Sequence, residues 1–146
     1  MKRVRTALIE HGRATEWLTA SELLMFGLIL ALPGNTLLSS PGYAGLRAIG
    51  LTEMTLAAML LIVGTMRLCA LYINGNWRRT PWMRAAGAMI GMALFSMLSV
   101  SAAWAYFVGG SPALSTGAGA YGILALFDAL AAYRSGADAR VAQLAH

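Results

Sequence analysis

Charged side chains are scarce in this sequence. Only 12% of its 146 residues are Asp, Glu, Lys or Arg, about half of the roughly 25% that is usual in soluble domains. Hydrophobic residues make up 58%, and a small soluble domain leaves too much of its surface in water to hide that fraction. The composition therefore predicts one domain, residues 1–146, with the lipid bilayer as its solvent.

Histidine and cysteine are almost absent. His11 and His146 lie outside the apolar segments, so no pair of intramembrane ligands for haem or zinc exists. Cys69 is the only cysteine, which excludes a disulfide framework and indicates a packed thiol. G-x-S-x-G, H-E-x-x-H and P-loop motifs are also missing. We therefore expect no catalytic residues, no cofactor and no metal, and the absence of an aromatic and basic platform predicts no nucleic-acid partner.

Apolar segments separated by Pro, Gly and Asn organise the chain, and strand-type alternation is lacking. The first segment ends at "PG" (33–34) and the second at "NGN" (74–76). A charge-free run from Ala85 to Phe127 is too long for one span and is divided by "GGSP" (109–112). The pattern predicts an all-α, integral membrane four-helix bundle with spans at about 15–32, 51–73, 85–108 and 113–133, and with a loop over residues 33–50.

The start of the chain is open to two interpretations. "MKRVR" and "LLMFGLILAL" (23–32) have the basic and apolar parts of a signal peptide. Glu16 and Glu22, however, lie close to or within the apolar stretch, after a polar lead of 22 residues. A retained first membrane helix is the favoured interpretation.

Basic residues are distributed unevenly between the two sides of the predicted bundle. Nine of the eleven lie in the N-terminal lead, in the 74–84 loop or in the C-terminal tail, and only Arg47 lies in a loop on the other side. Because cytoplasmic loops carry the excess of Lys and Arg, we expect both termini and the 74–84 loop in the cytoplasm of a bacterium, with the chain in its inner membrane. The same loop contains a predicted basic and aromatic anchor at the headgroup level, formed by Trp77, Arg78, Arg79, Trp82 and Arg84.

Three charged residues lie deep in the predicted spans. Counted along their helices at 1.5 Å per residue, Glu22, Arg67 and Asp128 each lie about 9–10 Å from the cytoplasmic edge. Unpaired charges at that depth are unfavourable and usually face inward, so we predict an ion cluster of these three residues. In the alternative, the long side chain of Arg67 extends to the cytoplasmic interface. Glu16 and Glu53 are expected to be hydrated near helix ends.

Two glycines in the third span, Gly87 and Gly91, form a small-xxx-small pair. Such pairs let two helix backbones approach closely. We therefore predict that they form a helix-packing surface.

Four segments of the chain resemble a set of small four-helix membrane proteins encoded by tailed phages and prophages of proteobacteria. These segments are "ATEWL", "SPGYAGL", "RLCALYINGNWRRTPWMR" and "FDALAAYRSGADAR". The resemblance covers about residues 14–140 and is most specific in the central basic loop. It implies a phage-associated, inner-membrane setting, and it implies no activity or site residues.

Three classes of function fit these features. The first is a holin-like protein, which assembles as a homo-oligomer or with a membrane partner and permeabilises the membrane. The second is a non-enzymatic structural or regulatory protein, such as an accessory subunit or a superinfection-exclusion factor. The third is a proton or ion conduit that uses Glu22 and Asp128. We rank them in this order.

Overall fold

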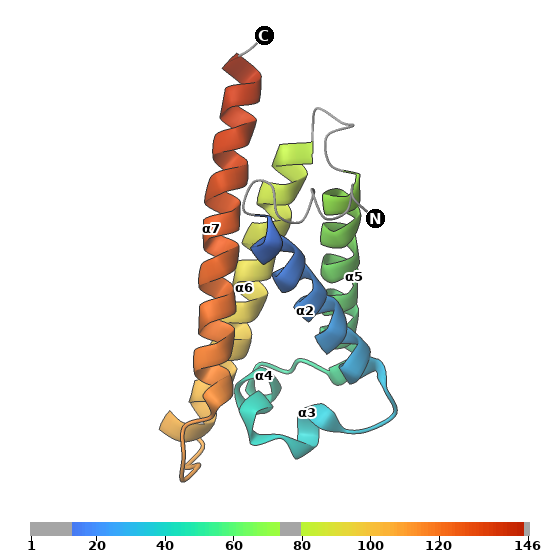
Figure 1. Ribbon diagram of the computed structural model, residues 1–146. Coiled ribbons are helices and arrows are strands. Elements are labelled where there is room, and N and C mark those ends of the chain that lie inside the picture. Colours follow the sequence, from blue (N-terminus) through green and yellow to red (C-terminus); the bar gives the residue numbers. More distant parts are fainter. Residues whose placement is uncertain (1–12, 74–79, 145–146) are drawn as a thin grey trace.

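The computed structural model describes residues 13–73 and 80–144, and this part of the chain is helical and contains no β-strand. The all-α prediction is confirmed. The long helices are α2 (Ala14–Ala31), α5 (Glu53–Tyr72), α6 (Thr80–Phe107) and α7 (Thr116–Leu144) (Figure 1). Within the described ranges, three segments are long and apolar enough to cross a membrane: Ala14–Ala31, Glu53–Tyr72 and Trp82–Phe107.

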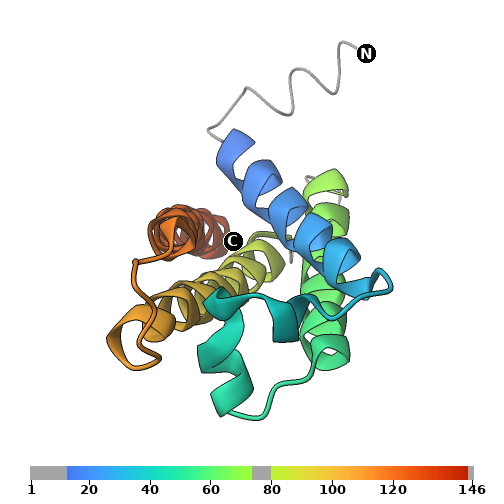
Figure 2. The same ribbon diagram turned by 90° about the horizontal axis from the view of Figure 1, so that it is seen from below.

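The long helices are arranged as two pairs. α2 packs along α5 and α6 packs along α7, whereas contacts between the pairs are fewer (Figures 1 and 2). Two glycines bring the backbones of α2 and α5 together. A Cβ atom added to Gly27 would lie 2.8 Å from the backbone nitrogen of Leu61, and one added to Gly64 would lie 2.7 Å from that of Leu24. Any side chain at either glycine would force the two helices apart.

The segment between α2 and α5 was predicted as a loop, but it contains three short helical elements. These are α3 (Thr36–Ser39), η1 (Pro41–Tyr43) and α4 (Ala44–Ala48), which lie beneath the ends of the long helices (Figures 1 and 2). Ser101 of α6 fastens this segment, because its hydroxyl donates to the carbonyl of Gly42 and accepts from the amide of Leu46.

Opposite charges hold the two ends of α3. The carboxylate of Glu53 accepts hydrogen bonds from the amides of Thr36 and Leu37, at 3.0 and 3.3 Å. The guanidinium of Arg47 donates to carbonyls at the other end, those of Leu37, Leu38 and Ser40. An anion at the N-terminus and a cation at the C-terminus of a helix both favour the helix dipole. Glu53 is therefore half-buried and bonded to the backbone, where hydration had been expected.

Two helix boundaries differ from the predictions. α6 begins at Thr80, so residues 80–84 belong to a helix although the predicted loop extended over 74–84. α7 continues to Leu144, well beyond the predicted end at residue 133. The tail "ADARVAQL" is rich in Ala, Arg, Gln and Leu, which favour helix. Between α6 and α7 the chain reverses at Gly110, whose positive φ of 69° suits a residue without a side chain.

The apolar core lies between the two pairs on the side of the α3–α4 segment. It includes Leu23 from α2, Leu56 and Leu60 from α5, and Phe95 and Leu98 from α6. These side chains are almost completely buried. The opposite half of the interface between the pairs is polar.

Candidate functional site: two buried ion pairs between the helix pairs

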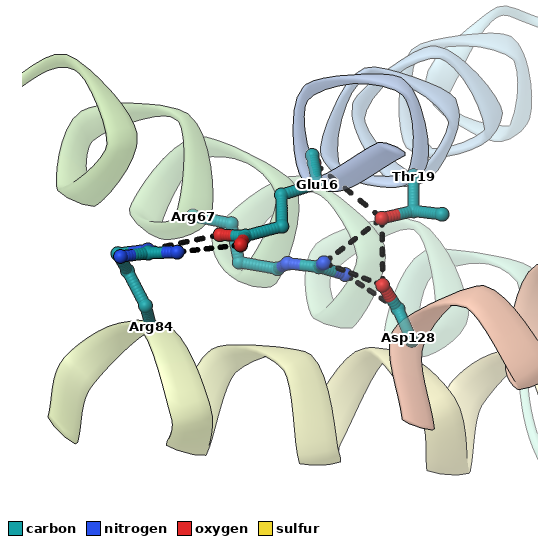
Figure 3. A network of polar contacts seen from close by, with 5 residues as sticks. All are labelled: Glu16, Thr19, Arg67, Arg84 and Asp128. Atoms are coloured by element: carbon teal, nitrogen blue, oxygen red, sulfur yellow. Dashed lines mark hydrogen bonds and ion pairs between the residues drawn. The ribbon is translucent and has the colours of Figure 1, made fainter. Parts of the chain in front are cut away.

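Five polar side chains from all four long helices meet in the half of the bundle away from α3 and α4. We call Glu16, Thr19, Arg67, Arg84 and Asp128 the polar network (Figure 3). On α2 the network residues Glu16 and Thr19 are followed by the buried residues Leu23, Gly27 and Leu30. Spacings of three and four place these residues on one face of a helix. The polar network therefore continues the inward face of the apolar core.

Arg67 and Asp128 form the first ion pair, from α5 to α7. The Arg67 Nη1 donates to Oδ2 of Asp128 and Nη2 donates to Oδ1, both at 2.6 Å. Thr19 completes the group, because its hydroxyl donates to Oδ1 of Asp128 at 2.6 Å and accepts from Nη2 of Arg67 at 2.9 Å. The Asp128 carboxylate thus accepts three hydrogen bonds and is 0% exposed. The Arg67 guanidinium points into the bundle and not toward the interface, which excludes the alternative of an extended, snorkelling side chain.

Arg84 and Glu16 form the second ion pair, from α6 to α2. Nε of Arg84 donates to Oε2 of Glu16 at 2.9 Å, and Nη2 donates to Oε1 at 2.5 Å. Both side chains are buried, with 5% and 7% of their surface exposed. The planar guanidinium fork matches the two carboxylate oxygens, the arrangement in which an arginine binds a carboxylate most specifically.

Gly91 and Gly87 of α6 provide the space that Arg67 occupies. A Cβ atom added to Gly91 would overlap Oδ2 of Asp128 and Nη1 of Arg67, and one added to Gly87 would lie 3.0 Å from Cγ of Arg67. The predicted helix contact at this glycine pair is therefore made with side chains of α5 and α7 and not with a facing backbone. The pair accommodates a long side chain that crosses α6 on its way to α7, whereas Gly27 and Gly64 make the close backbone contact.

The charges of the polar network cancel. It contains two cations and two anions, and each is bonded to a partner on a different helix. A small cavity of about 10 Å³ lies between the two ion pairs and is lined by Glu16, Arg67, Ala70, Leu71 and Arg84. The two pairs are thus neighbours in one electrostatic group rather than separate contacts.

The structure brings together two of the three residues in the predicted cluster. Arg67 and Asp128 are paired, but Glu22 is half-buried on α2 and takes part in neither ion pair. Arg67 and Asp128 meet, as the residue count from the helix ends predicted, but on α2 their partner is Thr19. The count did not specify rotation about the helix axis. Glu22 precedes Leu23 by one residue, or about 100° of helix rotation, and so lies off the inward face.

The structure removes one residue, Arg84, from the predicted basic and aromatic anchor. Arg84 is buried in an ion pair and does not reach the headgroups, because α6 begins before it and turns it inward. Trp82 is about half exposed, so its place in the anchor stays a prediction. Trp77, Arg78 and Arg79 lie outside the described residues.

Sequence reasoning missed Glu16 and Thr19. Glu16 was interpreted as a hydrated residue near a helix end, yet it is buried, and Thr19 was not considered. The available signal was their spacing with Leu23 along α2. Cys69, predicted to be packed, is exposed on α5.

The chemistry of the site is electrostatic. Among the described residues, no group of three His, Cys, Asp or Glu side chains is placed to hold a metal ion. Comparisons with protein-family models, with curated proteins and with solved structures found no match for this chain. The function must therefore be argued from the polar network and from the surface around it.

Proposed function

We propose that the protein spans the bacterial inner membrane four times, with α7 as the fourth span and with both termini in the cytoplasm. Asp128 lowers the average hydropathy of α7, but its carboxylate is buried and paired. The outward side chains of the same stretch are apolar, among them Ile123, Leu126 and Leu130. The side of α7 that would face lipid is therefore apolar along this stretch.

The orientation is supported by the role of Arg47. This is the one basic residue in a predicted outer loop, and its guanidinium is bonded to carbonyls of α3. It has a local structural function, so it does not weaken the excess of basic residues on the cytoplasmic side.

Cysteine accessibility tests this topology. In a Cys69→Ala background, single cysteines at Ile49 and Leu114, which are both exposed, should react with an impermeant thiol reagent added outside intact spheroplasts. A cysteine at position 78 should react only after the membrane is opened. Labelling of position 78 from outside would refute the orientation.

We further propose that the protein acts as a holin-like factor, which permeabilises the membrane after several copies assemble. One observation carries this proposal: four charged side chains of the long helices, Glu16, Arg67, Arg84 and Asp128, are buried together at the junction of two helix pairs. Ionisable residues inside a membrane are expensive and usually serve a function. A junction that was only structural could use apolar side chains, since replacing a buried ion pair by apolar residues is often neutral or stabilising. The resemblance to phage-encoded membrane proteins provides a setting in which permeabilisation is useful.

A structural or regulatory role is the second candidate. The observation that favours it is the complete internal pairing of the polar network, which would set helix register without further activity. A proton or ion conduit ranks below both, because Asp128 is 0% exposed and its oxygens are occupied by Arg67 and Thr19.

Induced expression in a bacterial host separates the first two candidates. We expect entry of a membrane-impermeant DNA dye and loss of membrane potential once the protein accumulates. The variant Arg67→Leu/Asp128→Ala, which lacks the first ion pair, should permeabilise far less at the same amount of protein in the membrane. Glu22→Gln, outside the network, should behave like the parent. Normal growth with an intact potential at high expression would exclude the holin-like function and leave the structural one.

A further inference from the structure

The outer surface of the bundle is unsuited to contact water at membrane depth. Each long helix presents large apolar side chains outward, including Met25 and Leu28 on α2, Met59 and Ile62 on α5, Met89 and Ile90 on α6, and Leu126 and Leu130 on α7. Copies that assembled through these surfaces without opening would enclose an apolar space. A water-filled path needs polar side chains from another source.

The polar network is such a source. Its two ion pairs both cross the junction between the α2–α5 pair and the α6–α7 pair, which we call the seam. Opening the seam would expose two guanidiniums, two carboxylates and the Thr19 hydroxyl. Water can solvate these groups, but lipid cannot, so opening is favourable only where water enters at the same time.

Packing across the seam is weaker than packing within each pair. Within the α2–α5 pair, Gly27 and Gly64 bring the backbones into contact. Across the seam, by contrast, an apolar groove of about 170 Å³ lies between α5 and α6, beside Arg67, and its walls include Val63, Met66, Ala70 and Ile90. Contacts between the pairs are therefore fewer beside the polar network than contacts within each pair.

We propose that the seam opens to form the polar lining of the permeabilising state. This inference rests on the proposed holin-like function and assigns the lining to the polar network. In the closed protein the network holds the pairs together, and in the assembled state the same side chains face water.

The test compares a cysteine at the seam with a cysteine on the lipid-facing surface. In a Cys69→Ala background, Ala70→Cys places a thiol at the seam, beside the cavity between the ion pairs, at a position that is 7% exposed. Leu126→Cys places a thiol on the lipid-facing surface of α7. A cationic, impermeant methanethiosulfonate is added during induction, and labelling is followed together with dye entry. Ala131→Cys, one turn from Asp128 on α7, is a second seam position in case Ala70→Cys folds poorly.

We expect labelling of the seam cysteine to rise about tenfold or more as dye entry begins, because a closed protein populates a minor open state at about 10% or less. Leu126→Cys should stay unlabelled. Dye entry with labelling of Leu126→Cys and none at the seam would overturn this inference while the holin-like function stands. Seam labelling in cells that exclude the dye would also overturn it, because opening would then not form a path. Absence of dye entry from the parent and all variants would instead refute the proposed function itself.

Discussion

Replacing Gly91 by alanine adds a single methyl group to the protein, and we expect it to break an ion pair. The new Cβ would overlap Oδ2 of Asp128 and Nη1 of Arg67. Both atoms are at the ends of side chains and could move, but each is buried, and moving either one separates the charges. Losing one partner of a buried pair costs roughly 3–5 kcal/mol, and alanine gains about 1 kcal/mol over glycine in a helix. The expected net loss is therefore about 2–4 kcal/mol.

The assay is unfolding of the purified protein in mixed micelles, followed by circular dichroism as the fraction of denaturing detergent rises. Gly119→Ala is the matched control, because an added Cβ there meets no atom within 4 Å, and it should be neutral or stabilising by up to about 1 kcal/mol. In the background Arg67→Leu/Asp128→Ala, which lacks the first ion pair, the penalty of Gly91→Ala should disappear. This comparison isolates the coupling between Gly91 and the ion pair. Equal stability of Gly91→Ala and Gly119→Ala would refute the argument that Gly91 makes room for the pair.

Three further predictions concern single charges and one phenol. Arg67→Leu alone should be less stable than Arg67→Leu/Asp128→Ala by about 2 kcal/mol or more in the same assay, because the single change leaves a buried carboxylate without its partner. The reverse order of stability would contradict the pairing. Glu16→Gln should lower the free energy of unfolding by about 3 kcal/mol, whereas Glu22→Gln on the same helix should stay within about 0.5 kcal/mol of the parent. Equal effects of the two changes would mean that the buried ion pair of Glu16 does not stabilise the fold. Burial, with a contribution from the neighbouring Tyr121, raises the pKa of Tyr43 to about 12 from its ordinary value of 10.0. The ultraviolet titration of the folded protein should therefore contain a late step that Tyr43→Phe removes. The unfolded chain loses that proton first, and the folded state should therefore lose stability as the pH rises from about 10 to about 12.

Apolar runs and their interruptions were enough to place the long helices. Pro33 and Gly34 end the first segment, and the interruption near Gly110 divides the long charge-free run, so α2, α6 and the start of α7 were located to within a few residues or a turn. The continuation of α7 was missed because the fourth helix was predicted only as far as its apolar stretch, and the tail that follows is polar. The short element α3 was missed because Glu53 and Arg47 bond to it from other parts of the chain. The element α4 was missed because its contact with Ser101 joins residues 55 positions apart, which local sequence does not reveal.

The level of the ion pairs could be predicted, but their composition could not. Counting residues from helix ends gave similar depths for Arg67 and Asp128. The inward face of α2, however, is determined by its contact with α5 at Gly27 and Gly64, and this contact decides that Glu16 is inside and Glu22 is not. The spacing of Glu16 and Thr19 with Leu23 places them on one face of α2, but only the packing of α2 against a distant segment decides that this face points inward.

Both ion pairs join the first half of the chain to the second. Arg67 and Asp128 are 61 residues apart, and Glu16 and Arg84 are 68 residues apart. A ribosome releases α2 and α5 before α6 and α7 have been synthesised. The first two helices must therefore enter the lipid while their final partners are still missing.

Each half contains one cation and one anion of the polar network, Glu16 with Arg67 and then Arg84 with Asp128. Within the network, each half of the chain is therefore electrically neutral by itself, so neither half brings an excess charge to the junction.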